Sequence, residues 1–345
     1  MSYQRVIACR FGGPEVLQTV DVEERPRPGR GEVRVKVLAA GTGYTDTLVR
    51  RGLYPYLKDK PPFTPGYDIV GIVDALGEAV TDLEIGQAVA DLPIWGGYSQ
   101  YLVRPAASLV PMPAGLDPAE AVCLPLAFMT AYQMLVRYRR FERGERIFIQ
   151  GASGTVGTAL LALGKHFDLR MWGTASRSKF GILERYHCTP IDHRQEDFAA
   201  RLRREVADGV DGVFDAIGGI AWRHAYRLLR PRGLLCGYGA QSLMQSGASK
   251  LQLGGQLALD LGFLLLRSNM PGNEGRRGVF YDIGRRRIRH PRQYAEDLQA
   301  LFELLRSRAI APEVAERRPL SDAAEVHRLI DGGQPAGKIV LLPFS

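Results

Sequence analysis

Cysteines are scarce in this 345-residue sequence, and no two of them lie close together. Cys9, Cys123, Cys188 and Cys236 form no C-x-x-C spacing, which argues against a structural zinc site and against a disulfide framework. We expect isolated thiols, most of them buried as small apolar side chains.

Long apolar runs are missing as well. The longest, LALDLGFLLL at residues 257–266, contains Asp260 and falls well short of a bilayer span. The first residues, MSYQRVIACRFGG, lack the apolar stretch of a signal peptide. We therefore expect a cytoplasmic protein with no membrane span.

The chain also lacks the patterns of a nucleic-acid binder, although its net charge is +8 and its pI about 9.4. The basic residues are dispersed except at residues 275–292, GRRGVFYDIGRRRIRHPR. No zinc-finger spacing or aromatic–basic ladder accompanies this patch. We expect a solvated helical face and no nucleic-acid partner, with a polyanionic ligand as the alternative.

The length favours two domains, because a single core stops growing below this size. Residues 1 to about 110 contain short β-rich runs separated by glycine and proline. In one run, residues 32–41, Val33, Val35 and Val37 share a face. This pattern predicts a mostly antiparallel barrel or sandwich.

Strand and helix patterns alternate from residue 146 onward, which indicates βαβ units and a parallel α/β sheet. Residues 117–138 read as helical, with Pro125 expected to kink the segment or split it into two helices. Residues 292–310 predict an amphipathic helix, and residues 337–343 predict a strand that returns to the first domain.

The glycine loop GASGTVG follows a predicted strand and precedes a predicted helix. Its spacing, Ala152-x-Gly154-x-x-Gly157, matches the dinucleotide-binding fingerprint G-x-G-x-x-G with alanine at the first position. Gly154 would let a pyrophosphate approach the backbone, and Gly157 would let the helix pack closely on the strand. The start of the helix at about Thr155 would supply free N–H groups. The predicted phosphate contacts are Ser153, Gly154, Thr155, Val156 and Gly157.

The next strand carries no acid that could hold the ribose 2′-hydroxyl of NAD, since none occurs between Leu169 and Leu183. Ser176, Arg177 and Lys179 stand there instead, a hydroxyl and two cations suited to a 2′-phosphate. The alternative is that the two cations only begin an exposed helix. We predict NADP(H) as the cofactor.

Several motifs resemble one known family. They include FGGPEVL (11–17), TPGYDIVGIVDALGEAV (64–80), GGYSQYLV (96–103), GASGTVG (151–157) and residues 316–341. With them the chain resembles the zinc-free quinone oxidoreductase branch of the medium-chain dehydrogenases/reductases, nearest to the vesicle-amine-transport-protein-like members.

The resemblance implies a GroES-like β-barrel domain and a Rossmann domain with a doubly wound parallel sheet. The first would comprise residues 1–122 with 293–345, and the second, which binds NADP, residues 123–292. Members commonly form homodimers through edge strands of the Rossmann domain.

The resemblance also indicates that no metal is bound. Zinc-dependent relatives carry Cys, His and Glu ligands where this chain has Gly43, Tyr67 and Asp68. Quinone oxidoreductases, in turn, usually have Asn at the position of Gly43 and often Tyr at that of Leu48. These two departures favour a substrate other than a simple quinone.

Further cofactor contacts are implied at Thr130 and Lys338, which match family positions, with a surface lysine as the alternative for Lys338. His193 replaces an aromatic residue that the family has near the adenosine phosphate, and is a further expected contact. Two more pairs follow predicted Rossmann strands, where ligands bind. These are Ile217 with Gly218 and Tyr238 with Gly239.

The predicted reaction is hydride transfer from NADPH to the C=C bond of an α,β-unsaturated carbonyl, or to a quinone. Candidate catalytic residues are Tyr44, Asp46 and Tyr54, with Arg50 as a further donor. The alternatives are that Tyr54 is a packed wall of the cleft, that Asp46 is structural, and that Arg50 pairs with Asp46 or faces solvent. The apolar segment 251–272 indicates buried core, a dimer interface, or a lid over a lipophilic carbonyl substrate. The rival hypothesis is a non-redox member, either a cofactor-binding regulator or a cyclising or eliminating enzyme.

Overall fold

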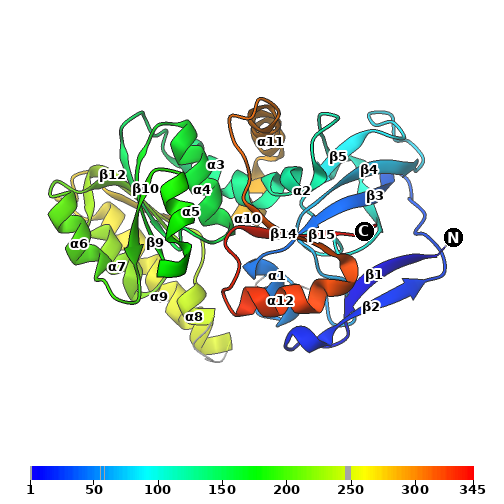
Figure 1. Ribbon diagram of the computed structural model, residues 1–345, viewed down its shortest axis with the longest axis horizontal. Coiled ribbons are helices and arrows are strands. Elements are labelled where there is room, and N and C mark those ends of the chain that lie inside the picture. The colour runs from blue at the N-terminus through cyan, green and yellow to red at the C-terminus, as the bar shows by residue number, and fades with distance from the viewer. Residues whose placement is uncertain (1, 55, 58, 245–249) are drawn as a thin grey trace. The chain divides into compact units, whose positions relative to one another are not determined.

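The computed structural model describes residues 2–54, 56–57, 59–244 and 250–345. The chain forms two compact units, one of Met1–Met129 with Pro291–Ser345 and one of Thr130–His290. Figure 1 follows the chain through both by colour. Each unit is described separately below.

The first unit is built on β-sheet. The hairpin of β1 (Tyr3–Ala8) and β2 (Leu17–Val22) stands apart from a seven-stranded sheet of order β14-β15-β3-β4-β5-β7, in which β6 pairs with β3. The strands of this sheet are β3 (Glu32–Gly41), β4 (Ile69–Leu76), β5 (Ala88–Asp91), β6 (Tyr101–Pro105), β7 (Val110–Pro111), β14 (Val314–Pro319) and β15 (Lys338–Leu342).

The alternating valines of β3 bury one face of this sheet, as predicted. Val33, Val35 and Val37 are fully buried in the core of the unit. Strand β15 pairs antiparallel with β3, so the chain returns to the first unit as expected. Figure 1 shows β15, in red, beside β3, in blue.

Helices and short 3-10 turns complete the first unit. They are η1 (Pro14–Val16), α1 (Tyr44–Arg50), η2 (Ala106–Ser108), α2 (Pro118–Ala121), the π-helical η3 (Leu124–Phe128), α11 (Pro291–Arg306), η6 (Leu320–Asp322) and α12 (Ala323–Asp331). The Asp117 carboxylate caps α2 by accepting from the Ala119 N–H at 3.0 Å.

Pro125 marks an interruption of the helical segment, as predicted, because α2 ends at Ala121 and the next helical element begins at Leu124. It lies in the first turn of η3, where a missing N–H costs nothing, and helical backbone continues through α3 (Met129–Gln133) and the π-helical η4 (Met134–Tyr138). By length and composition alone Pro118–Tyr138 could cross a membrane, but 78% of its most apolar window is buried in the structure.

The second unit is a six-stranded parallel sheet of order β10-β9-β8-β11-β12-β13. Its strands are β8 (Arg146–Gln150), β9 (Arg170–Ala175), β10 (Cys188–Asp192), β11 (Val210–Asp215), β12 (Leu229–Gly237) and β13 (Arg277–Phe280). The order reverses between β8 and β11, which makes this a doubly wound α/β sheet and confirms the predicted fold class.

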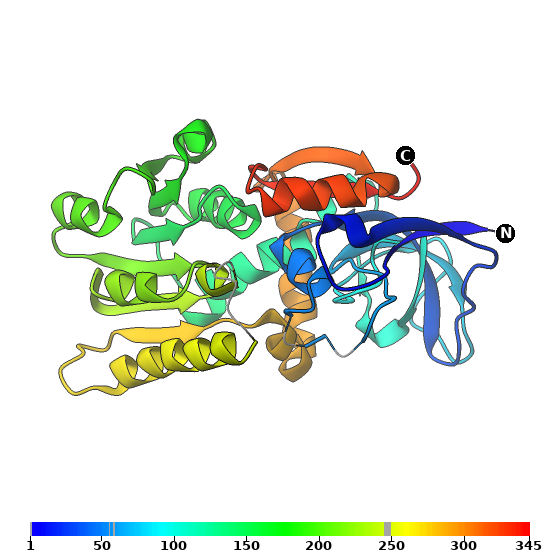
Figure 2. The same cartoon turned by 90° about the horizontal axis from the view of Figure 1, so that it is seen from below.

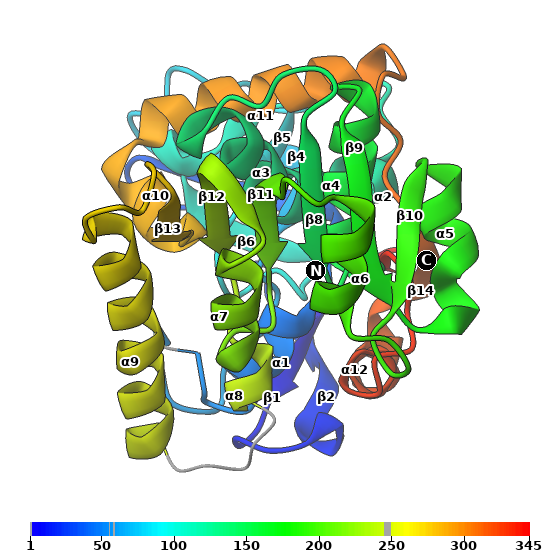
Figure 3. The same cartoon turned by 90° about the vertical axis from the view of Figure 1, so that its left-hand side faces the viewer.

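The helices of the second unit connect these strands. They are α4 (Thr155–His166), η5 (Arg177–Lys179), α5 (Phe180–Arg185), α6 (Phe198–Glu205), α7 (Ile220–Tyr226), α8 (Gln241–Met244), α9 (Lys250–Asn269) and α10 (Ile283–Arg289). Since parallel crossovers are right-handed, the reversal of strand order places α4 and α5 on one face and α7 and α9 on the other (Figure 3).

Helix α9 runs beside the edge strand β13, where Figure 2 shows it in yellow. Asp260 and Leu264 are buried, whereas Leu259, Leu265 and Leu266 are 64%, 64% and 70% exposed. The interpretation of this segment as buried core is therefore wrong for one face of the helix. The lid and the dimer interface remain as its alternatives.

Candidate functional site

The glycine loop lies between β8 and α4, as predicted. Gly154 is the N-terminal cap of α4 but provides no side-chain cap, and the first turn contains no acid. The positive end of the helix dipole is thus not neutralised locally, which suits a phosphate. A Cβ at Gly157 would lie 2.4 Å from the Gly151 oxygen, so only glycine lets α4 begin this close to the loop.

Thr174 anchors this loop and was not singled out by the sequence. Its Oγ1 accepts from the Gly151 N–H at 2.9 Å, and its carbonyl oxygen accepts from the Ala152 N–H at 2.9 Å. Gly151 has a φ of 72°, a left-handed backbone that glycine adopts without strain. The sequence signal that could have identified Thr174 was its hydroxyl, one residue before the end of β9, in a strand whose other residues after Arg170 are apolar.

Cations follow the ends of β9 and β10. Ser176 and Lys179 are half-buried and Arg177 is exposed, while His193 and Arg194 are exposed after β10. Burial and the nearby charge of Arg194 lower the pKa of Lys179. Arg194 therefore extends the predicted cationic set. Sequence reasoning missed it, although it directly follows His193.

Two further loops meet at the same edge of the sheet. The Tyr238 N–H donates to the Asp215 carbonyl oxygen at 3.0 Å, and a Cβ at Gly239 would lie 2.6 Å from the Ala216 oxygen. Gly218 has a φ of 79°. The predicted cofactor residues on these loops thus all follow carboxyl ends of strands in one parallel sheet. They are those of the glycine loop together with Ser176, Arg177, Lys179, His193, Ile217, Gly218, Tyr238 and Gly239. Thr130 lies apart from these loops, buried in α3.

A buried acid–lysine cluster lies in the first unit. Lys338 Nζ donates to Asp68 Oδ2 at 2.6 Å, and both side chains are almost inaccessible. The surface alternative for Lys338 is therefore wrong. A Cβ at Gly41 would lie 2.2 Å from Asp68 Oδ1, so this packing requires glycine there.

Asp46 lies beside this pair, fully buried in α1. Neither of its carboxylate oxygens has a hydrogen-bond partner of good geometry among the described residues. Burial and the neighbouring Asp68 raise the pKa of Asp46 to about 8, although Lys338 opposes the shift. Asp46 therefore carries a proton at neutral pH.

Tyr54 and Tyr67 form a hydroxyl pair, their oxygens 2.5 Å apart. Tyr67 is buried and Tyr54 half-buried, with the rings packed edge to face. Tyr44, the first residue of α1, has a buried hydroxyl, and burial raises its pKa. Three phenolic hydroxyls, those of Tyr44, Tyr54 and Tyr67, thus belong to this unit.

Arg50 neither pairs with Asp46 nor faces solvent, contrary to the sequence-based alternatives. It is buried, and it donates to Asp331 at 2.6 Å and to His327 Nδ1 at 3.0 Å. Because a guanidinium only donates, the His327 ring proton lies on Nε2, which donates to the Tyr98 hydroxyl at 3.1 Å. Arg50 thereby ties α1 to α12 and has a structural role.

The donor set does not fit zinc. Gly43 offers no ligand, and Tyr67 is already paired with Tyr54. Within the part of the chain that the structure describes, no three His, Cys, Asp or Glu side chains gather as a metal site would require.

Two protein families match separate segments of the chain. The alcohol dehydrogenase GroES-like domain matches residues 29–114, and the family described as zinc-binding dehydrogenase matches residues 187–341.

Among the similar proteins is a quinone oxidoreductase of Pseudomonas aeruginosa, 30% identical over 99% of this chain and 99% of its own length. A 2-haloacrylate reductase of a Burkholderia species is 29% identical over 96% of each chain. A synaptic vesicle membrane protein VAT-1 homolog of Danio rerio is 33% identical over 70% of this chain, and the match spans only 50% of that relative.

Solved structures of similar proteins have the same fold. The quinone oxidoreductase of Escherichia coli complexed with NADPH superposes with a TM-score of 0.84 at 26% identity, covering 99% of this chain and all of that one. A mycobacterial protein complexed with NADPH gives a TM-score of 0.82 at 25% identity with the same coverage.

Proposed function

Because the chain belongs to the zinc-free quinone oxidoreductase branch of the medium-chain dehydrogenase/reductase family, we propose that it is an NADPH-dependent oxidoreductase. Its substrate is the C=C bond of an α,β-unsaturated carbonyl or a quinone, with a lipophilic body. The observation that carries this proposal is the carboxyl edge of the Rossmann sheet, where a glycine loop and a cationic set lie together.

The described residues fit NADPH better than NADH. The uncapped start of α4 suits the pyrophosphate, and Ser176, Arg177 and Lys179 stand where NAD enzymes place an acid. Arg194 adds positive charge near Lys179. A 2′-phosphate would pair with these cations, whereas a bare 2′-hydroxyl carries no charge to pair with them.

When bound, NADPH supplies the hydride. The substrate carbonyl oxygen then gains negative charge, which a hydroxyl donor stabilises. We propose Tyr54, hydrogen-bonded to Tyr67, as this donor, with Tyr44 as the other candidate. Asp46 holds its proton inside the unit beside the charged Lys338–Asp68 pair and so adds no negative charge there.

The 2-haloacrylate reductase relative supports an activated C=C bond as the reacting group. A haloacrylate and an enone both place a C=C bond next to an electron-withdrawing group. Gly43, in the place where quinone oxidoreductases usually have Asn, further favours an enone over a simple quinone.

The second candidate is a non-redox member that binds NADPH without transferring hydride. It is favoured by one feature, the loss of the Asn side chain at Gly43. Turnover separates the two candidates.

The first experiment is a pair of calorimetric titrations with NADPH and NADH. We expect micromolar NADPH affinity and NADH at least about tenfold weaker, which corresponds to about 1.4 kcal/mol. NADPH oxidation is then followed with a panel of enones, haloacrylates and quinones, including long-chain members. Binding without oxidation of NADPH by any of them would support the non-redox candidate, and absence of binding would refute both.

A further inference from the structure

Asp215, the last residue of β11, forms a buried clasp at the carboxyl edge of the Rossmann sheet. Its side chain is fully buried and lies in register with Gln150, the last residue of β8. Oδ2 accepts from Gln150 Nε2 at 2.6 Å. Oδ1 accepts from the N–H groups of Ile217 at 2.6 Å and Gly218 at 3.0 Å. One carboxylate thus joins two strand ends and the loop that follows.

The position of this clasp relates it to the dinucleotide. β8 and β11 are the two strands between which the strand order reverses, and ligands of doubly wound sheets bind outside the carboxyl ends of strands at such a point. The glycine loop follows β8, and the loop 216–219 follows β11. The clasp therefore lies where the two loops begin.

The loop 216–219 has few other means of keeping its shape. Gly218 and Gly219 have φ angles of 79° and 66°, and neither has a side chain to pack. Besides Asp215, its hydrogen-bond partners among the described residues are Gln241 and Ser242, which donate to the carbonyl oxygens of Ala216 and Ile217, and Trp222, whose N–H donates to the Gly219 carbonyl oxygen at 3.2 Å. Asp215 supplies the acceptor for the two N–H groups at the start of the loop.

We infer that Asp215 is a positioning residue for the dinucleotide, because its carboxylate fixes the backbone of residues 216–219 at the crevice where the cofactor binds. This inference rests on the proposed function. Asp215 does not contact the cofactor itself and acts through Ile217 and Gly218.

The ionisation of Asp215 supplies a second readout. Burial raises its pKa to about 6, although the N–H groups of Gly218 and Ile217, Trp222 of α7 and Gln150 oppose the shift. Tyr238 faces it from β12, and burial and Asp215 raise the pKa of that phenol, so Tyr238 stays neutral. Cys236 of β12 is likewise a neutral thiol because of burial. Below about pH 6 a proton on Asp215 displaces one of its accepted hydrogen bonds.

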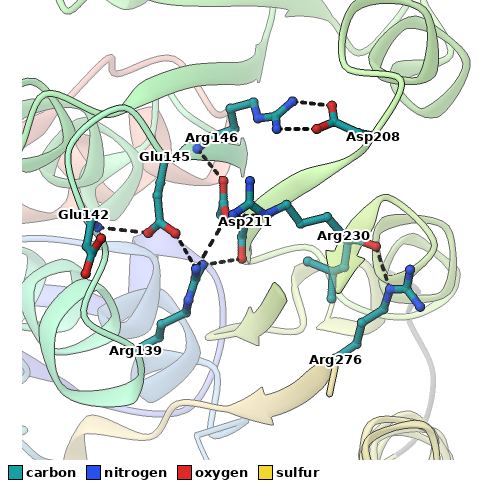
Figure 4. A network of polar contacts seen from close by, with 9 residues as sticks. Arg139, Glu142, Glu145, Arg146, Asp208, Asp211, Arg230 and Arg276 are labelled. Atoms are coloured by element: carbon teal, nitrogen blue, oxygen red, sulfur yellow. Dashed lines mark hydrogen bonds and ion pairs between the residues drawn. The ribbon is translucent and has the colours of Figure 1, made fainter. Parts of the chain in front are cut away.

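Asp211 provides a matched control on the same strand. It is also fully buried, but it lies near the amino end of β11, at the opposite end of the strand from Asp215, in the network of Figure 4. Its carboxylate accepts from the Arg146 N–H at 2.9 Å and pairs with Arg230 at 2.7 Å and with Arg139. Replacing Asp211 thus removes a buried carboxylate of β11 without touching the loop 216–219.

The experiment compares D215N and D211N by NADPH titration at pH 7.5 and 5.5, together with the thermal midpoint. We expect both variants to lose thermal stability. Only D215N should raise the Kd for NADPH, by at least tenfold at pH 7.5, while D211N stays within twofold of the wild type. The wild type should bind more weakly at pH 5.5, and the loss of affinity between pH 7.5 and 5.5 should be smaller in D215N, where the 2′-phosphate, with its own pKa of about 6, still titrates but Asp215 does not.

A second variant covers the case in which D215N does not fold. Gln150→Met removes one donor to Asp215 and keeps the side-chain volume, and we expect a severalfold higher Kd for NADPH. Wild-type Kd in D215N, or an equal rise in D211N, overturns the inference but leaves the proposed function intact. No NADPH binding by the wild type overturns both.

Discussion

We expect single side chains after β9 to determine which dinucleotide this chain accepts. We expect Arg177→Ala and Lys179→Ala each to raise the Kd for NADPH by about tenfold, as lost charge-assisted phosphate contacts do, with little effect on NADH. Calorimetry with both dinucleotides measures the two effects. Arg185→Ala is the control, since Arg185 is an exposed cation at the end of α5, the helix that directly follows η5. Equal losses for NADPH and NADH would refute a 2′-phosphate site.

Gly43 is a second position where one side chain matters. A Cβ there would meet only Asp46 Oδ2, at 3.9 Å, and its φ of −167° suits any residue. We expect Gly43→Asn to leave the thermal midpoint nearly unchanged and to raise quinone reduction at least about tenfold, as a restored polar donor would. Gly41→Asn is the control and should destabilise the protein, because its Cβ would lie 2.4 Å from Lys338 Cε. No gain in quinone reduction would mean that the missing Asn does not limit this reaction.

Asp46 should make stability depend on pH. With a pKa of about 8 in the folded protein against 3.8 ordinarily, it keeps a proton that the unfolded chain loses. Its contribution to the free energy of unfolding therefore falls as pH rises between about 4 and 8, by up to about 1.4 kcal/mol per pH unit. Urea unfolding at pH 5 to 8 should show Asp46→Asn gaining on the wild type as pH rises. The exposed Asp82→Asn is the control, and parallel curves for wild type and D46N would contradict the expectation.

At the scale of elements, α4 and its glycine loop pack so closely that there is no room for a Cβ at Gly157. Gly157→Ala would place a Cβ 2.4 Å and 2.6 Å from backbone atoms of Gly151 and Ala152, so α4 must move. We expect a loss of about 1–3 kcal/mol in stability and weaker NADPH binding. Gly255→Ala in α9 is the control: nothing lies within 4 Å of its Cβ, and alanine should stabilise that helix by about 0.5–1 kcal/mol. Wild-type NADPH affinity in G157A would show that the loop tolerates displacement.

Elements with a strong local signal were predictable from the sequence. The alternating valines gave β3, and the glycine spacing gave the β8–α4 turn, because both patterns depend on neighbours in the chain. Helix α1 was missed since its few residues bury Asp46, Thr47 and Arg50, which are not apolar. The π-helical turns on either side of α3 were not predicted, because such turns have no sequence signature.

The other interactions that the sequence did not predict join residues that are far apart in the chain. Lys338 and Asp68 are 270 residues apart, and Arg50 and Asp331 are 281 apart, so only the fold brings them together. Asp215 ends a predicted strand, but its role became visible only once β8 and β11 were adjacent. The residues of the dinucleotide edge were easier, because each follows a recognisable strand.

At the scale of the whole molecule, we expect the exposed leucines of α9 to contact another protein surface, since exposed apolar side chains that lie together often mark an interaction site. The sequence predicts a homodimer, and we expect light scattering to find one. The variant L259Q/L265Q/L266Q should then be monomeric with unchanged NADPH affinity. If it stays dimeric but shows a higher KM for long-chain enones than for short ones, α9 is a lid and not an interface.

The return of β15 to β3 has a consequence for synthesis on the ribosome. Lys338 leaves the ribosome 270 residues after Asp68, roughly 15 to 50 s later at ordinary elongation rates. Until then the nascent first unit lacks both β15, one of the strands that pair with β3, and the cation that neutralises its buried carboxylate. The unit Thr130–His290 is complete before that moment. The unit that begins second along the chain is therefore able to finish folding first. The N-terminal strands can complete their sheet only after β15 has been synthesised.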